Sequence, residues 1–345
     1  MLYRVMDKRE LPKLVDAFME SYEVVAPVKR GSGYVFSAIG SFDDIALDYT
    51  ITASSPKKYL IPPKETLMTF DARANMVTDF EQQVVPRVVF GLHACDINAL
   101  NRLDLVFGKG SYRDPYYEAR RAATIVVGLS CTPSQNCFCR QMDSDEAQFG
   151  YDLFLHDIGD KYLISMSSVE AANILEAACD LAEATDADRI AFRHATRARE
   201  AAFNPDIPMI EDVAMLMDAF HKDDFWEELG SRCLSCTACS AVCPTCFCFD
   251  IRDELAPDGN TGERVREWDA CTNPSFAVVT GGYNFRPDGR NRVRHRMYHK
   301  LNGFMATHDR MLCVGCGRCV VACKANINPI EVLRFFERKG AEDAE

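Results

Sequence analysis

The stretch CLSCTACSAVCPTCFC, residues 233–248, places six cysteines within sixteen residues. Its first four cysteines have the spacing C-x2-C-x2-C-x3-C and are followed by Pro244. The stretch CVGCGRCVVAC, residues 313–323, repeats the same spacing. Bacterial ferredoxins hold 4Fe–4S clusters with runs of this kind. The two runs therefore predict a module with two 4Fe–4S clusters.

The spacing also predicts which cysteines share a cluster. Three thiolates at two-residue gaps can surround an iron–sulfide cube and bind three of its irons, and in two-cluster ferredoxins the fourth cysteine of each run binds the other cluster. We expect one cluster on Cys233, Cys236, Cys239 and Cys323. The second cluster is expected on Cys313, Cys316, Cys319 and Cys243. Because the ligands cross, residues 244–312 form a long insertion within one module.

Structural zinc is the alternative for these thiols. Zinc sites favour paired C-x2-C knuckles with four ligands for each ion. Two complete four-cysteine runs fit iron–sulfur clusters better. A non-redox zinc-binding scaffold or interaction subunit is the competing interpretation, and a self-contained reductase with an unrecognised flavin site is the third.

Two strand-like segments lie in the N-terminal half. RVVFGL, residues 87–92, and TIVVGLS, residues 124–130, are continuous apolar runs typical of buried strands. The segment between them has helical periodicity, and Asp96 is expected to cap this helix. Strand, helix and strand at this spacing predict a βαβ unit with parallel strands.

Cysteines follow both of these strands. Cys95 comes soon after the first strand and Cys131 directly after the second, with Cys137 and Cys139 close behind. Ligands bind outside the carboxyl ends of strands in such sheets. We therefore expect a third cluster on these four thiols. A zinc site with the same ligands and ordinary buried thiols are the alternatives.

Four other cysteines lie outside these sets. Cys246, Cys248 and Cys271 fall in the insertion. They form an additional site with one non-cysteine ligand or pack beside the clusters, and the sequence permits both. Cys179 stands alone in a helical segment and is expected to be part of a core.

The overall pattern predicts an α+β protein. Residues 1–205 are expected to form an α/β domain with a partly parallel sheet, including a hairpin with Gly159 in its turn. Residues 206–338 are expected to form an α-helical dicluster ferredoxin domain with the insertion 244–312. Residues 339–345 read as a disordered acidic tail.

Composition excludes several classes of protein. The 345 residues include 39 Lys and Arg against 51 Asp and Glu, a net charge of −12 that argues against nucleic-acid binding. The first residues lack the apolar core of a signal peptide, and no apolar run approaches the roughly 20 residues that span a bilayer. We expect a cytoplasmic protein without membrane insertion, whose 16 cysteines are metal ligands rather than disulfides. No nucleotide-binding motif and no catalytic residue stands out, so neither flavin nor nucleotide is expected on this chain.

One segment is strongly basic. RPDGRNRVRHRMYHK, residues 286–300, alternates basic and other residues, which predicts an edge strand with arginines on one side. Such a strand would steer a partner subunit or balance the anionic clusters. A solvated charged face is the alternative.

The chain also resembles a known family, through motifs between about residues 56 and 338. In order they are KETLMTFD, ACDINALNRLD, NCFC, RCLSCTACSAVCPTCFC, REWDACTNPSF, GGYNFRP, RVRHRMYHKLN and CVGCGRC. Through them it resembles the 4Fe–4S dicluster electron-transfer subunit of anaerobic sulfite reductase and the related beta subunit of cytosolic sulfhydrogenases. One departure is Lys324 after Cys323, where the pattern usually has proline.

The resemblance implies an iron–sulfur electron-transfer subunit of an oxidoreductase complex. Such a subunit takes electrons from a flavin-containing subunit that oxidises NAD(P)H and passes them to a catalytic subunit. That catalytic partner is a siroheme sulfite reductase or a nickel–iron hydrogenase, and the shared motifs do not distinguish them. The resemblance also supports a functional role for Cys95, Cys131, Cys137 and Cys139, which fall in or beside its motifs.

Overall fold

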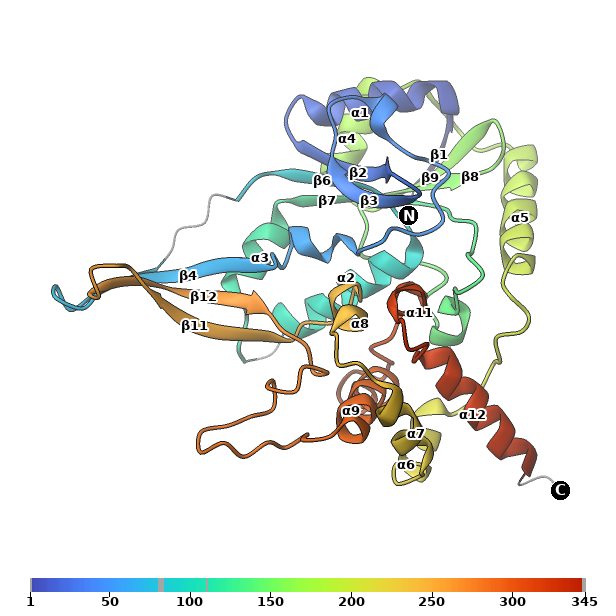
Figure 1. The fold of residues 1–345 in the computed structure, drawn as a ribbon. Coiled ribbons are helices and arrows are strands. Elements are labelled where there is room, and N and C mark those ends of the chain that lie inside the picture. Colours follow the sequence, from blue (N-terminus) through green and yellow to red (C-terminus); the bar gives the residue numbers. More distant parts are fainter. Residues whose placement is uncertain (1, 80–83, 110, 343–345) are drawn as a thin grey trace.

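The computed structural model of the protein describes residues 2–79, 84–109 and 111–342. It has a large mixed sheet, a smaller antiparallel sheet and a group of C-terminal helices (Figure 1). The predicted α+β fold class is confirmed. Within the described ranges, no helix is long and apolar enough to cross a membrane.

The large sheet has eight strands in the order β10-β1-β9-β8-β7-β6-β2-β3. Its four neighbours β8, β7, β6 and β2 run parallel, and the other pairs are antiparallel. The predicted parallel unit and the hairpin β8–β9 at Gly159 are confirmed. The strands are β1 (Leu2–Asp7), β2 (Glu23–Arg30), β3 (Gly33–Ala38), β6 (Arg87–Leu92), β7 (Thr124–Leu129), β8 (Leu153–Asp157), β9 (Lys161–Met166) and β10 (Leu181–Ala182).

Helices cover both faces of this sheet. On one face, α1 (Leu11–Met19) and α4 (Val169–Ala178) pack on residues such as Val88 and Val127. On the other face, α2 (Ala94–Phe107) and α3 (Pro115–Ala122) pack on residues such as Val89. All six residues of β7 are buried because both of its faces are covered. Cys179 lies in the first of these cores, as expected.

Asp96 does not cap the helix that follows β6, and this prediction is wrong. The helix α2 begins at Ala94, and His93 is its N-terminal cap residue. Asp96 therefore lies in the first helical turn, where it is 1% exposed and forms an ion pair with Arg318. Its carboxylate connects two distant segments of the chain instead of a helix end.

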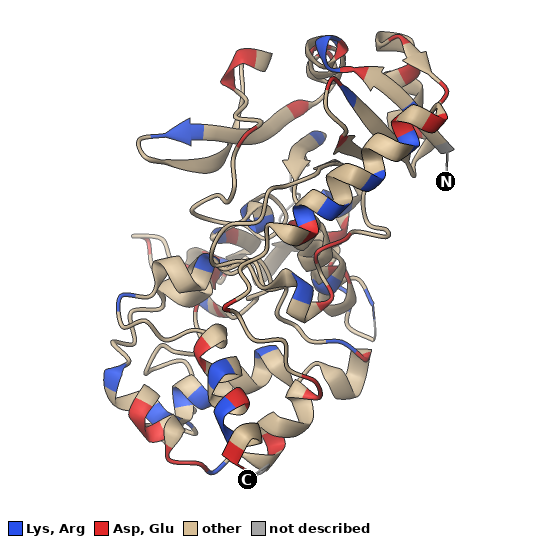
Figure 2. Ribbon diagram, turned by 90° about the vertical axis from the view of Figure 1, so that its right-hand side faces the viewer, with Lys and Arg blue, Asp and Glu red and all other residues tan. Residues whose placement is uncertain are grey.

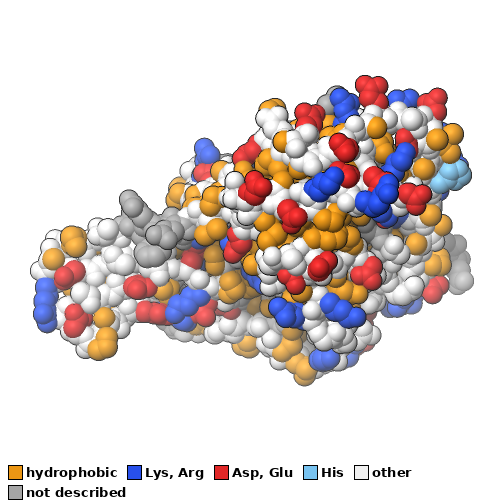
Figure 3. Space-filling view, turned by 90° about the horizontal axis from the view of Figure 1, so that it is seen from above, with side chains coloured by type: hydrophobic (Ala, Val, Ile, Leu, Met, Phe, Trp, Pro, Cys, Tyr) orange, Lys and Arg blue, Asp and Glu red, His pale blue; other side chains and the backbone are white. Residues whose placement is uncertain are grey.

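A second sheet joins the two halves of the sequence. It has four antiparallel strands in the order β11-β12-β4-β5, and it projects from the body as an arm (Figures 1 and 3). Its strands are β4 (Lys64–Asp71), β5 (Met76–Asp79), β11 (Phe249–Leu255) and β12 (Thr261–Trp268). The predicted division at residue 205 does not describe this sheet, because β12 from the insertion pairs with β4 from the N-terminal half.

Buried charges anchor the base of this arm. Arg266 of β12 forms ion pairs with Glu65 of β4, at 2.6 Å, and with Asp114 before α3. Arg120 of α3 pairs with the same Glu65. These side chains are at most 13% exposed, so the network holds the arm firmly on the N-terminal domain.

The C-terminal helices enclose a separate core around Trp226, which is fully buried. In that core, the rings of Phe225 and Phe335 stack with centroids 4.2 Å apart. A helix that the sequence did not predict, α5 (Asp186–Ala201), links the two parts along one side of the molecule (Figure 1). The other helices are α6 (Val213–Ala219), α7 (Phe225–Arg232), α8 (Ala238–Ala241), α9 (Gly289–Leu301), α10 (Met305–His308), α11 (Arg318–Ala322) and α12 (Pro329–Glu342).

The basic segment 286–300 is a helix, not the predicted edge strand. Asp288 caps α9 by accepting a hydrogen bond from the backbone N–H of Asn291. Arg292, Arg296 and Lys300 then recur every four residues and are all buried on one face. Because these three side chains are buried, the run is not simply a solvated charged face. Figure 2 shows basic and acidic residues interspersed along the other helices.

The predicted disordered tail starts too early. Helix α12 continues to Glu342, and an ion pair of 2.8 Å between Lys339 and Glu342 stabilises its last turn. Residues 343–345 of the predicted tail lie outside the described residues.

Candidate metal centres

The two cysteine runs fold in the same way. Ser235 and Gly315 take the left-handed backbone conformation, with φ of 52° and 62°. Thr237 and Gly317 do so as well, with φ of 64° and 76°. A short helix starts after each run of turns, α8 in the first and α11 in the second, and these helices pack together. Each two-residue gap thus turns its flanking cysteines toward the same side.

The runs surround two pockets, and each pocket receives one cysteine from the other run. The first pocket is lined by Cys233, Cys236, Cys239 and Cys323. The second pocket is lined by Cys313, Cys316, Cys319 and Cys243. The structure therefore brings together both sets that the sequence assigned to clusters. Their role as ligands remains a prediction.

Backbone amides donate to several of these sulfurs. The N–H groups of Ser235 and Gly315 lie 3.4 Å from the Sγ atoms of Cys233 and Cys313, respectively. A third amide, that of Ile327, donates to Cys323 Sγ at 3.3 Å. Amide donors favour thiolate over thiol and are one of the features that set the potentials of iron–sulfur clusters.

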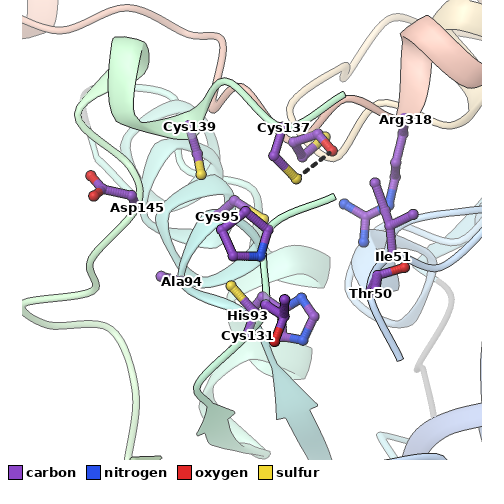
Figure 4. A pocket seen from close by; sticks show the side chains of 13 residues that line it. Thr50, Ile51, His93, Ala94, Cys95, Cys131, Cys137, Cys139, Asp145 and Arg318 are labelled. Atoms are coloured by element: carbon purple, nitrogen blue, oxygen red, sulfur yellow. Dashed lines mark hydrogen bonds between the residues drawn. The ribbon is translucent and has the colours of Figure 1, made fainter. Parts of the chain in front are cut away.

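The four N-terminal cysteines line a third, enclosed pocket. Cys95 lies in the first turn of α2, Cys131 follows β7, and Cys137 and Cys139 come from the next loop. Figure 4 shows their side chains turned toward one another. Burial raises the pKa of the Cys131 thiol to about 11, so a positively charged metal centre would be needed to keep this sulfur deprotonated at neutral pH.

The pockets adjoin one another. Cys316 lines both the second and the third pocket, and its carbonyl oxygen lies 4.0 Å from Cys137 Sγ. Arg296 lines both the first and the second pocket. The three pockets therefore form a row through the protein, with the second in the middle.

A tight backbone contact fixes the third pocket against the second. The amide of Phe138 donates to Gly315 O at 2.8 Å. A Cβ atom on Gly317 would lie 2.5 Å from the carbonyl oxygen of Asn136, so only glycine fits there. The loop that carries Cys137 and Cys139 thus rests directly on the second cysteine run.

We predict that Gly317→Ala loses about 1–3 kcal/mol of stability, because alanine is strained at positive φ and also collides with Asn136. Urea unfolding under anaerobic conditions measures the loss. Gly282→Ala is the matched control, since Gly282 has a similar φ of 80° with nothing within 4 Å of the added Cβ. Equal losses in the two variants would show that the contact with Asn136 contributes nothing.

Besides Arg318, which is paired with Asp96, five buried cations lie around the pockets. They are Lys57, Arg102, Arg292, Arg296 and Lys300, and each is at most 9% exposed. Among the described residues, none of them has a carboxylate within ion-pair distance. They donate to neutral oxygens instead: Lys57 Nζ lies 2.9 Å from Cys246 O, and Lys300 Nζ lies 3.0 Å from Thr245 O.

Burying an unpaired cation is costly unless an anion compensates for it. Iron–sulfur cubes with four thiolates are anionic, so the cations fit such groups at these pockets. Burial acts to lower the pKa of Lys300, but attraction to the sulfurs of the nearby Cys243 and Cys246 outweighs it and raises that pKa above its usual value. The backbone amide donors and the buried cations around the pockets are thus consistent with iron–sulfur clusters.

We predict that Lys300→Met lowers the midpoint potential of the adjacent centre by on the order of 100 mV, since a positive charge close to a cluster favours its reduced state. An anaerobic potentiometric titration followed by electron paramagnetic resonance measures the midpoint. Lys222→Met is the control, because Lys222 is exposed. A midpoint that stays unchanged or rises in Lys300→Met would contradict the prediction.

The remaining cysteines of the insertion lie beside the second pocket. The thiol of Cys246 contacts Cys243, and that of Cys248 contacts Cys271. Hydrogen bonding from Cys271 lowers the pKa of Cys248 to about 6, although burial opposes this. In the part of the chain that the structure describes, no three Cys, His, Asp or Glu side chains meet closely enough for one metal ion. The further site on Cys246, Cys248 and Cys271 remains a prediction.

A buried ion pair between α2 and α11 completes the wall of the third pocket. The two terminal guanidinium nitrogens of Arg318 lie 2.7 Å from the carboxylate of Asp96, and Thr52 accepts two more hydrogen bonds from this side chain. Neither this pair nor Lys57 is indicated by the sequence. Their partners are distant in sequence, so no local motif indicates them.

Comparison with known proteins gives two matches. The family model described as "4Fe-4S dicluster domain" matches residues 232–327. The chain is 34% identical over 334 residues to the beta subunit of sulfhydrogenase 2 from Pyrococcus furiosus, covering 96% of this chain and 98% of that one. No solved structure matches the chain.

Proposed function

Since this chain belongs to the family of the sulfhydrogenase beta subunits, we propose that it is the iron–sulfur electron-transfer subunit of a multi-subunit oxidoreductase. One observation carries the proposal: three adjoining pockets are lined by twelve cysteines, and buried cations without carboxylate partners in the described structure lie around them. Iron–sulfur cubes held at these pockets would accept and release single electrons.

The chain's own residues set the order of the sites. Cys233, Cys236, Cys239 and Cys323 would hold the first centre, and Cys313, Cys316, Cys319 and Cys243 the second. Cys95, Cys131, Cys137 and Cys139 would hold the third. Arg296 separates the first site from the second, and Cys316 forms the wall between the second and the third.

We further propose two partners. One is a flavin-containing subunit that oxidises NAD(P)H and donates electrons. The other is a catalytic subunit of the sulfhydrogenase or anaerobic sulfite reductase type. The name of the Pyrococcus protein, a beta subunit, supports assembly with other subunits.

Anaerobic purification of the full chain tests the proposal. We expect about twelve iron atoms and about twelve acid-labile sulfides per chain, and a paramagnetic signal after reduction with dithionite. A colourless protein with stoichiometric zinc and no sulfide would reject the proposal in favour of a zinc-binding scaffold. Flavin released on denaturation would instead indicate a self-contained reductase.

A further inference from the structure

A large cavity lies between helix α5 and the carboxyl ends of the parallel strands β7 and β8. Its volume is about 770 Å3, which falls within the range of roughly 300–1,000 Å3 typical of small-molecule sites. The cavity exists because α5 packs loosely: Asp188 is the one buried residue of this helix. In open α/β sheets, this end of the strands is where ligands bind.

One wall of the cavity is a row of aromatic rings. The ring centroids of Tyr151 and Phe154 are 5.4 Å apart, and those of Phe154 and His156 are 4.5 Å apart. Phe192 of α5 continues the row, 5.0 Å from His156. Burial lowers the pKa of His156 to about 4, so its ring is neutral at pH 7. Such a wall favours a flat aromatic ligand that can stack on it.

The charges of the cavity disfavour phosphate. Four carboxylates line it, from Asp48, Asp145, Glu146 and Asp157. Arg199 is the one arginine or lysine among the lining residues described, and it lies 3.2 Å from Glu146 and 4.0 Å from Asp145. Asp157 is also paired with Lys8, at 2.6 Å, so the four carboxylates face two cations and the cavity keeps a net negative charge. This charge disfavours a phosphate group and favours an uncharged or cationic ring system.

The cavity also reaches the third cysteine set. Cys131 lines both the cavity and the enclosed four-cysteine pocket. An occupant would therefore lie directly against a proposed ligand of the third centre. We infer that this cavity binds a planar aromatic molecule without phosphate groups, either uncharged or cationic, held between α5 and the aromatic row and against Cys131.

Calorimetric titration of the anaerobically purified full chain tests the inference, with no reductant present. Oxidised methyl viologen serves as the cationic probe, menadione as the neutral one and FMN as the phosphate-bearing one. We expect the first two to bind and FMN to bind at least about tenfold more weakly. Absence of binding by both methyl viologen and menadione would overturn the inference, and so would FMN binding as tightly as they do.

Two α5 variants locate the site. Ala195 lines the cavity, so Ala195→Trp is expected to weaken methyl viologen and menadione binding about tenfold or more by filling the space. His194 is exposed on the same helix and does not line the cavity, so His194→Trp is the matched control and should bind normally. Unchanged affinity in Ala195→Trp would place the probes elsewhere and overturn the inference.

A second variant changes a charge instead of a volume, so the inference can still be tested if the tryptophan variant misfolds. Asp48→Asn should weaken methyl viologen binding about threefold or more and leave menadione affinity unchanged. Equal methyl viologen affinity in Asp48→Asn and the parent would contradict the charge argument. Iron and sulfide counts on the same samples report separately on the proposed function, because probe binding here depends on the cavity and not on cluster content.

Discussion

Replacing Cys319 with alanine is expected to remove about four iron atoms and about four sulfides from each chain, the content of one 4Fe–4S cluster. Cys319 is 8% exposed and lines the second pocket with Cys313, Cys316 and Cys243. A cube that loses a ligand in so closed a site cannot recruit water easily. Arg296, buried beside this pocket, would also lose its compensating anion, so we expect the chain to become less stable as well.

Iron and acid-labile sulfide per chain, measured after anaerobic purification, check this result. Cys179→Ala is the matched control, because Cys179 is equally buried but lies in the core between α1, α4 and the large sheet. The control should retain the full iron content. If Cys319→Ala keeps all its iron, the assignment of the second site is wrong.

The same measurement on Cys131→Ala addresses the third site alone. Removal of this thiol should again lower the iron content by about four while the two sites of the ferredoxin-type runs stay loaded. Cys131 belongs to the N-terminal pocket and lines neither of the other two. An unchanged iron content in this variant would leave the chain with two clusters and refute the third.

Asp96→Asn is expected to cost about 3–5 kcal/mol of stability, because it removes the carboxylate that pairs with the buried charge of Arg318. The two side chains are 1% and 2% exposed, and two contacts of 2.7 Å join them. They connect α2 of the N-terminal domain to α11 of the second cysteine run. Loss of this pair should therefore loosen the third pocket, which Arg318 lines.

Anaerobic urea unfolding measures the effect, and Asp253→Asn provides the control. Asp253 also forms a two-contact pair with an arginine, Arg264, at 2.7 and 2.9 Å, but both side chains are 44% exposed. Exposed pairs contribute at most about 1 kcal/mol. The double variant Asp96→Leu/Arg318→Met should recover much of the loss. A loss below about 1 kcal/mol in Asp96→Asn would show that the pair is not structurally important.

The cysteine runs were the most predictable part of this protein, because the gaps between their thiols are a local property of the chain. The spacing of Cys233, Cys236 and Cys239 is enough to anticipate three donors on one side of a loop. The parallel strands were predictable for a similar reason. Strands buried on both faces read as continuous apolar runs, as β6 and β7 do.

The second sheet escaped prediction because its pairing is not local. Strand β11 is mostly exposed and carries charges, so it lacks the pattern of a buried strand. Its neighbour β12 pairs with β4, which lies in the other half of the chain. No pattern within either segment indicates its partner. Lys57, in the short 3-10 helix Pro56–Tyr59, was missed for the same reason, since its contacts with Ser240 and Cys246 span more than 180 residues.

The basic segment was wrongly predicted to be a strand because the spacing of its basic residues fits both a strand and a helix. Arg292, Arg296 and Lys300 are four residues apart, a spacing that fits one face of a strand and also one face of a helix. Asp288, followed three residues later by Asn291, was the signal for a helix start, and the structure shows this cap. The cavity beside α5 had no sequence signal, because it depends on how loosely that helix rests on the sheet.

The sheet shared by the two halves also constrains how the protein is made. One edge of β4 pairs with β5, which follows it directly, but the other edge pairs with β12, which begins at Thr261, 190 residues after β4 ends at Asp71, so this second edge leaves the ribosome long before its partner exists. At ordinary rates of translation this delay is roughly 10 to 40 s. During that interval β4 exposes unpaired backbone groups to any neighbouring strand. A chaperone would therefore protect this protein from aggregation most effectively while only its N-terminal half has been synthesised.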